Sequence, residues 1–197
     1  MRPLGRSFYA HDSRVMAPLL LNKVFVVGKR RARIVEVEAY AGAEDPASHA
    51  FRGPTRRNGT MFGPAGHLYV YFTYGMHWCS NVVCGETGWA SAVLLRGAAP
   101  VEGIDAMRDR RHAARRDRDL CSGPARLTQA LAITGARNGA DLVRGPVRLL
   151  DDGVPPPRRP GRSTRVGLKP GEGDESRWRW FVRDDPNVSP GRPAAGK

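Results

Sequence analysis

The pattern of apolar and polar positions predicts a pair of antiparallel strands near the N-terminus. Val24–Val27 is a run of β-branched and aromatic residues, and Gly28–Arg31 has the composition of a turn leading into a second strand at Arg33–Tyr40. Side chains of a strand alternate between its two faces. In the second strand one face holds Val35, Val37 and Ala39, and the other holds Ile34, Glu36, Glu38 and Tyr40.

The two carboxylates of this second strand need an explanation. Acidic residues are depleted in strands, and they are rarely fully buried unless they are paired or hydrogen-bonded. Glu36 and Glu38 therefore either form an exposed polar face or occupy buried positions with specific partners. The local pattern leaves both alternatives open.

A second hairpin is predicted in the middle of the chain. The segment His67–Thr73 alternates cleanly, and Met76–Val83 resumes the alternation after Tyr74-Gly75 interrupts it. One face of the first strand holds Leu68, Val70 and Phe72, and the other holds Tyr69, Tyr71 and Thr73. Tyr74 then lies at or near the tip, where a large aromatic side chain is badly placed for a core and well placed to insert into something else.

The remaining pattern predicts shorter elements and one long loop. We expect an amphipathic helix within residues 7–21 with Ser13 as its N-cap, and a central strand at Ser91–Gly97 whose Arg96 needs an anionic partner. Further elements are a basic helix at 101–116, a helix at 125–133 that opens at Ser122-Gly123-Pro124 and stops at Gly135, strands at 147–150, 164–168 and 177–183, an exposed loop at 155–162, and a long non-periodic segment at 41–66.

Composition narrows the class of protein. With 197 residues we expect a single domain that is stable without disulfides or structural metal. A net charge of +13 predicts attraction to a polyanion, nucleic acid first. No apolar run is long enough to span a membrane and no signal-peptide core is present, so we expect a cytoplasmic protein, and the three cysteines have no metal-binding spacing.

Separated motifs resemble the alkyladenine type of 3-methyladenine DNA glycosylase, from about Leu4 to Ser189. They are Val35-Glu36-Val37-Glu38-Ala39-Tyr40, Asn58-Gly59-Thr60-Met61-Phe62, Gly66-His67-Leu68-Tyr69-Val70-Tyr71-Phe72-Thr73-Tyr74-Gly75-Met76 ending at Asn81, Leu94-Leu95-Arg96 and Leu120-Cys121-Ser122-Gly123-Pro124. The resemblance implies a mixed α/β domain at residues 1–189, with a curved antiparallel sheet, flanking helices and a protruding hairpin that inserts into DNA. Residues 190–197 are then expected to form a flexible tail.

The resemblance also implies roles for individual residues. Glu38 matches the general base that deprotonates a water molecule, and Arg96 matches the residue that helps to fix that water, whereas Glu36 matches no catalytic role. The walls of the base pocket match Tyr40, His49 and Tyr71, and its floor matches Asn81, which disfavours normal guanine. An electron-poor, often cationic base would be attracted to the tyrosine faces.

The DNA contacts implied by the resemblance lie on the second hairpin and on the long loop. Tyr74 matches the side chain that fills the gap left by the flipped nucleotide, and Met76 would flank it. Arg56, Arg57 and His77 are candidate contacts to the DNA backbone. The family's reaction needs no metal or cofactor, and the expected partner is duplex DNA with damaged purines, bound by a monomer.

Two other functions remain as hypotheses. A glycoside hydrolase could use Glu36 and Glu38 as a carboxylate pair, because residues two apart on a strand face lie about 6–7 Å from each other. A non-catalytic binder of damaged DNA could use the same wedge and pocket. The basic charge and the tyrosine at the hairpin tip disfavour the first hypothesis, and the combination of Glu38 with Arg96 disfavours the second.

Overall fold

One antiparallel sheet forms the centre of the fold in the computed structural model, which describes residues 1–190. Its strands are β1 Arg2–Pro3, β2 Val24–Val27, β3 Arg30–Ala41, β4 Leu68–Thr73, β5 His77–Cys84, β6 Ser91–Glu102, β7 Val147–Asp151, β8 Gly161–Ser163 and β9 Arg179–Phe181. The helices are α1 Ser13–Leu20, α2 Ile104–Arg108 and α3 Pro124–Leu131, with 3-10 turns at Arg6–Tyr9, Gly42–Glu44, Gly59–Phe62, Asp117–Asp119 and Gly135–Arg137. The predicted tail lies outside the described residues except for Pro190.

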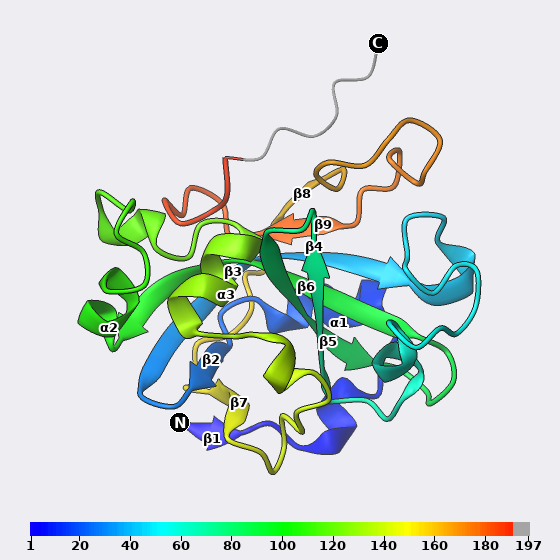
Figure 1. The fold of residues 1–197 in the computed structure, drawn as a ribbon, viewed down its shortest axis with the longest axis horizontal. Helices are drawn as coiled ribbons and strands as arrows, with labels where there is room; N and C mark the ends of the chain where they lie inside the picture. The colour runs from blue at the N-terminus through cyan, green and yellow to red at the C-terminus, as the bar shows by residue number, and fades with distance from the viewer. Residues whose placement is uncertain (191–197) are drawn as a thin grey trace.

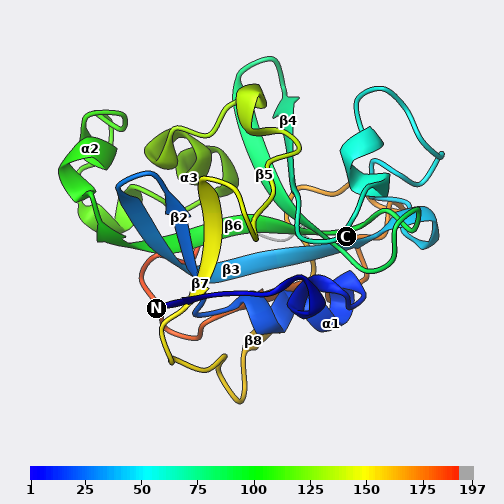
Figure 2. The ribbon, with the colours of Figure 1, turned by 90° about the horizontal axis from the view of Figure 1, so that it is seen from below.

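The sheet is organised around β3 (Figure 1). The strand order is β1-β7-β2-β3-β6-β5-β4, and β9 pairs with β3 outside this path and carries β8 at its other edge. In Figure 2 helix α3 covers one face of the sheet and helix α1 covers the other. The prediction of a mixed α/β chain with an antiparallel sheet and flanking helices is confirmed within residues 1–190. No helix in this part of the chain is long and apolar enough to cross a membrane.

The predicted first hairpin is confirmed, but the faces of its second strand differ from the prediction. Val27 pairs with Arg30, so the turn is Gly28-Lys29. The pairing of β3 with β6 shifts register on both sides of Glu36. Such a bulge interrupts the alternation of side chains, and Ile34 packs in the main core with Val37 and Ala39, whereas strict alternation predicts that it shares the face of the carboxylates.

The second hairpin is confirmed as predicted, with Tyr74 at its tip. Thr73 pairs with His77, and Tyr74 and Gly75 have φ angles of 52° and 65°, the left-handed conformation that a tight turn between strands requires. The side chains of Tyr74 and Met76 are 82% and 67% exposed. Figure 2 shows β4 and β5 projecting away from the plane of the sheet.

The helix boundaries depart from the predicted ones. The N-cap of α1 is Asp12, whose side chain accepts from the Arg14 N–H, and Ser13 is the first helical residue. Helix α3 ends at Leu131 because Ala132 adopts a left-handed conformation, so Gly135 lies beyond the helix and begins a 3-10 turn. Ser122 donates its hydroxyl to the Val188 carbonyl and does not cap α3.

Two predicted elements are wrong. The basic helix expected at 101–116 is limited to α2, because Met107 is its only buried residue and the arginine-rich continuation has no apolar face to pack. The strand expected at 164–168 does not form, since its Arg165 side chain and Val166 N–H bind carboxylates of distant segments. Strand β8 forms instead at the end of the predicted loop, and its Gly161 faces the Phe181 ring too closely for any side chain.

Gly97 follows Arg96 and pairs with Glu36 at the bulge. A Cβ atom added at Gly97 would lie 3.0 Å from Glu36 Oε2 and 3.1 Å from the Asn187 carbonyl oxygen. The absence of a side chain at this position therefore leaves room for a buried carboxylate.

We predict that Gly97→Ala lowers the free energy of unfolding by about 1–3 kcal/mol, because overpacking displaces the Glu36 carboxylate. Denaturant unfolding measures the change. Gly59→Ala is the control, since a Cβ atom there meets nothing within 4 Å. Equal stability of the two variants would contradict the tight fit at Gly97.

Candidate active site

Two carboxylates and an arginine form the buried centre of the site. Glu36 and Glu38 of β3 are both 0% exposed, which rules out an exposed polar face for either of them. Arg96, from the neighbouring strand β6, lies between them. Its Nε donates to Glu36 Oε1 at 2.9 Å, and its Nη1 donates to Glu38 Oε2 at 3.4 Å.

Glu36 has the more complete set of partners. Besides Arg96, its Oε1 accepts from Arg179 Nε at 2.7 Å and from the Ser189 hydroxyl at 2.8 Å, and its Oε2 accepts from the Ser189 N–H at 2.6 Å. Burial alone would raise the pKa of Glu36, but the charges of Arg96 and Arg179 and the Ser189 N–H reverse this and hold the pKa below its ordinary value. Glu36 therefore stays ionised and holds Arg96 in place.

Glu38 is less well compensated. Its Oε1 accepts from the Val166 N–H at 2.7 Å. Its Oε2 accepts from the Tyr40 hydroxyl at 3.1 Å and from Arg96 Nη1 at 3.4 Å. Burial raises the pKa of Glu38, and Arg96 and the Val166 N–H only partly oppose this effect. The two carboxylates of one strand thus have opposite pKa shifts, and Glu38 is the one whose burial makes it the better proton acceptor.

A cavity of about 240 Å³ opens beside these groups. It is lined by Tyr40, Ala47, His49, Met61, Tyr69, Tyr71, Thr73, Tyr74, Cys79, Asn81, Leu94, Arg96, Pro124, Val166, Gly167 and Leu168. Glu38 is not in the lining, and it lies behind Tyr40, Arg96 and Val166, all three of which donate hydrogen bonds to it. Residues from both hairpins and from two loops therefore line a cavity beside one buried carboxylate.

Aromatic rings form one wall of the cavity. The rings of His49 and Tyr71 meet edge to face with centroids 4.5 Å apart, and Tyr69 stacks on Tyr71 at 5.4 Å. His49 Nδ1 lies 3.1 Å from the Tyr69 hydroxyl. Partial burial and the charge of Arg57 lower the pKa of His49, which favours a neutral imidazole, while burial raises the pKa of Tyr69 to about 12.

The structure brings most of the sequence-predicted site residues together. Tyr40, His49, Tyr71, Asn81, Arg96 and Tyr74 all line the cavity. Asn81 is 4% exposed, and its Nδ2 donates to the Tyr69 carbonyl. The tip of the second hairpin therefore forms one rim of the same cavity, while Met76 and His77 lie outside it and are exposed.

The two loop arginines have different surroundings. Arg56 is exposed and makes no side-chain hydrogen bond or ion pair with any residue of 1–190. Arg57 is exposed too, but its Nη2 donates to the Phe72 carbonyl at 2.8 Å, and its guanidinium carbon lies 5.6 Å from the centre of the Tyr71 ring. Arg57 is therefore held against the second hairpin.

Sequence reasoning missed several groups of the site. Tyr69 shares a strand face with Tyr71, so the alternation of β4 carries a signal that could have identified it. No local signal indicated Arg165, which is 1% exposed and binds Asp45 through two hydrogen bonds of 2.6 Å and 2.8 Å. The Val166 N–H and Ser189 were missed for the same reason, because their partners lie on β3, far away in the sequence.

Comparison with known proteins relates the chain to one family of DNA glycosylases, both by a family model and by individual relatives. The family model described as methylpurine-DNA glycosylase matches residues 7–186. A protein of Burkholderia cenocepacia (strain HI2424), provisionally named a 3-methyladenine DNA glycosylase, is 52% identical over 187 residues, which cover 93% of this chain and 89% of the relative. Proteins of the same provisional name from Streptomyces avermitilis and Chlorobaculum parvum are 48% and 45% identical and cover 96% and 100% of this chain, and 92% and 95% of their own lengths.

We predict that Glu36→Gln lowers the free energy of unfolding at neutral pH by about 3–5 kcal/mol, because it leaves two buried guanidinium groups without their shared anion. The folded-state pKa of Glu36 is lowered, so its stabilising effect is present above the unfolded pKa and is lost as the pH falls through the folded value. Denaturant unfolding of wild type and variant at several pH values should show the difference shrinking in acid. A difference that does not change with pH would contradict an ionised Glu36.

Proposed function

Because the chain belongs to the methylpurine-DNA glycosylase family, we propose that it flips alkylated or deaminated purines out of duplex DNA and hydrolyses the N-glycosidic bond with a water activated by Glu38. Family membership makes the protein a DNA-repair hydrolase of the N-glycosyl bond. The observation that best supports the finer mechanism is a buried carboxylate of raised pKa directly behind an aromatic cavity.

In the proposed reaction Glu38 accepts a proton from a water molecule held near Arg96. The water oxygen bonds to the anomeric carbon as the bond from that carbon to the purine nitrogen breaks, and the purine leaves with the electron pair. An abasic site remains. The buried position of Glu38 favours this role because its raised pKa lies closer to neutral pH, where a general base works best.

The cavity walls supply recognition in this proposal. Tyr40 and Tyr71 offer aromatic faces to an extruded purine, and the neutral imidazole of His49 can stack and hydrogen-bond. Asn81 also lines the cavity, and in this proposal it forms the floor and disfavours normal guanine, whose exocyclic amine would clash there. A damaged or mispaired base also costs less to unstack, which adds a second source of discrimination.

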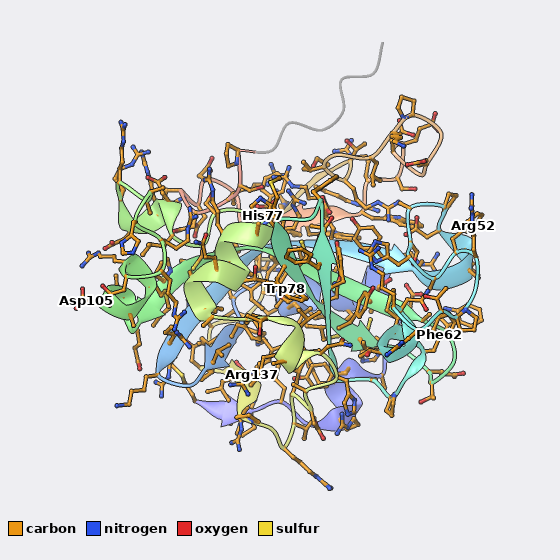
Figure 3. All side chains as sticks on the ribbon, viewed as in Figure 1. Arg52, Phe62, His77, Trp78, Asp105 and Arg137 are labelled. Atoms are coloured by element: carbon orange, nitrogen blue, oxygen red, sulfur yellow. The ribbon has the colours of Figure 1, made fainter. Side chains whose placement is uncertain are left out.

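The arrangement of the exposed segments supports a DNA-binding face. In Figure 2 the β4–β5 hairpin, the segment around α2 and the loop between β3 and β4 all rise on the side of the sheet opposite α1. Figure 3 shows His77 and Trp78 between Arg52 of this loop and Asp105 of α2. With a net charge of +13, phosphate contacts across this face, including Arg56 and His77, would make binding strongly dependent on salt.

The environment of Glu36 argues against a two-carboxylate glycoside hydrolase. Within residues 1–190 its carboxylate accepts hydrogen bonds from Arg96, Arg179 and Ser189 alone, and its lowered pKa makes it a poor general acid. A non-catalytic binder of damaged DNA remains the alternative to test. Failure to release hypoxanthine or a methylated purine from duplex DNA would favour the binder.

We predict that Glu38→Gln lowers the single-turnover rate of base release by about 10²–10⁴-fold, because the general base is lost. In the wild type the rate should fall with decreasing pH, with a midpoint above the ordinary glutamate pKa, since Glu38 must be deprotonated to act and burial raises its pKa. The measurement is excision of hypoxanthine and of a methylated purine from duplexes as a function of pH.

Glu36→Gln provides the comparison for this experiment, made at a temperature at which the variant remains folded. A variant with residual activity and an unchanged acid limb agrees with one general base. An equal loss in both variants, with both folded, would support the two-carboxylate scheme instead.

We predict that Tyr74→Ala slows base extrusion by about tenfold or more but weakens non-specific duplex binding much less, because the wedge offsets an unstacking cost of a few kcal/mol while phosphate contacts are made elsewhere. Stopped-flow fluorescence of a base analogue reports extrusion, and titration with undamaged duplex reports binding. Val15→Ala, an exposed apolar residue of α1 on the opposite side, is the control. Equal losses in extrusion and binding would contradict a wedge at this tip.

A further inference from the structure

Both tyrosines that match the stacking walls already carry an arginine. The guanidinium carbon of Arg165 lies 4.8 Å from the centre of the Tyr40 ring, and that of Arg57 lies 5.6 Å from the centre of the Tyr71 ring. These distances are within the range of a cation–π interaction. An extruded base therefore meets aromatic rings that each already interact with a protein cation.

The two arginines differ in how their charge is balanced. Arg165 is buried, and Asp45 binds it through both carboxylate oxygens, so this pair carries no net charge beside Tyr40. Arg57 is exposed and forms no ion pair with any residue of the described part of the chain. Its positive charge beside Tyr71 is therefore uncompensated by the protein.

Arg57 is also held in a defined position. The Phe72 carbonyl of β4 accepts a hydrogen bond from its Nη2. Phe72 directly follows Tyr71 in the chain, so this bond holds the guanidinium beside the Tyr71 ring. The charge acts on the same cluster, because Arg57 adds to the effect of burial in lowering the pKa of His49 and opposes the effect of burial that raises the pKa of Tyr69. The geometry thus places a fixed cation against the ring of Tyr71, which lines the cavity, while Arg57 itself lies outside the lining.

We propose that Arg57 is a specificity-determining residue that shifts the preference of the pocket from cationic N-alkylated purines towards neutral purine lesions. This inference rests on the proposed function. A cationic base stacked on Tyr71 competes with Arg57 for the same ring and is repelled by its charge. A neutral base such as hypoxanthine stacks without that penalty.

The decisive quantity is the ratio of two excision rates in one enzyme. We compare single-turnover release of 7-methylguanine, a cationic base, with release of hypoxanthine, a neutral base, from otherwise identical duplexes. The pH is kept at or just below neutral, where 7-methylguanine retains its positive charge and the lowered pKa of His49 favours a neutral imidazole. Arg57→Gln should raise the ratio of the 7-methylguanine rate to the hypoxanthine rate about two- to fivefold, which corresponds to the cation–π strength at an exposed site.

Two further variants separate the effect of charge at the ring from other effects. Arg56→Gln removes the same charge one residue away, without the contact to Tyr71, and should change both rates equally. Arg57→Lys keeps a cation at the position and should retain most of the wild-type ratio. Since Arg56 and Arg57 are both exposed, we expect all three variants to fold, and thermal unfolding checks this.

The possible outcomes distinguish this inference from the proposed function. If the wild type releases neither base, the proposed function fails. If both bases are released but the ratio in Arg57→Gln is unchanged or falls, the specificity role is wrong and Arg57 acts as a phosphate contact. An equal shift in Arg56→Gln, or an Arg57→Lys variant that behaves like Arg57→Gln, would also overturn it.

Discussion

The site depends on one arginine shared between two buried carboxylates. Burying three charged groups is costly, and the cost is offset only when every charge has partners of good geometry. Arg96 meets this condition through an unequal division, with a short bond to Glu36 and a longer one to Glu38. Glu36 is further neutralised by Arg179 and bound by Ser189. The negative charge of Glu38 is therefore the less compensated of the two.

This unequal division explains why distant segments converge on β3. The bulge at Glu36 admits its carboxylate opposite Gly97, and the C-terminal residues up to Ser189 cover it. The segment after β8 brings the Val166 N–H to Glu38, while Arg165 of that segment binds Asp45 in the loop after β3. The same contacts that satisfy buried charge also bring two loops to the edge of the cavity.

Arginine has several distinct uses in this protein. Arg96, Arg165 and Arg179 are buried and organise carboxylates and backbone carbonyls, for which the planar guanidinium with its five donors is suited. Others are exposed on the face that carries the second hairpin and contribute to the positive field expected to attract DNA. Net charge therefore describes affinity for a polyanion, whereas the position of each guanidinium decides its chemical role.

The sequence by itself determined the features that depend on neighbouring residues. A β-branched run followed by turn residues placed the first hairpin, and alternation placed the second with Tyr74 at its tip, because these patterns and turns are local properties of the chain. Motifs matched by resemblance identified Tyr40, His49, Tyr71, Asn81 and Arg96, all of which line the cavity. The acidic residues in a predicted strand were also a correct sign of a special environment.

Only the tertiary structure decided which environment each group has. Arg165 with Asp45, Val166 with Glu38, and Ser189 with Glu36 join residues 120, 128 and 153 positions apart, and no periodic pattern connects residues at such separations. The bulge that moves Ile34 into the core depends on pairing with β6. Opposite pKa shifts of two glutamates in one strand therefore arise from partners that meet only in the folded chain, because burial and hydrogen bonding set these shifts.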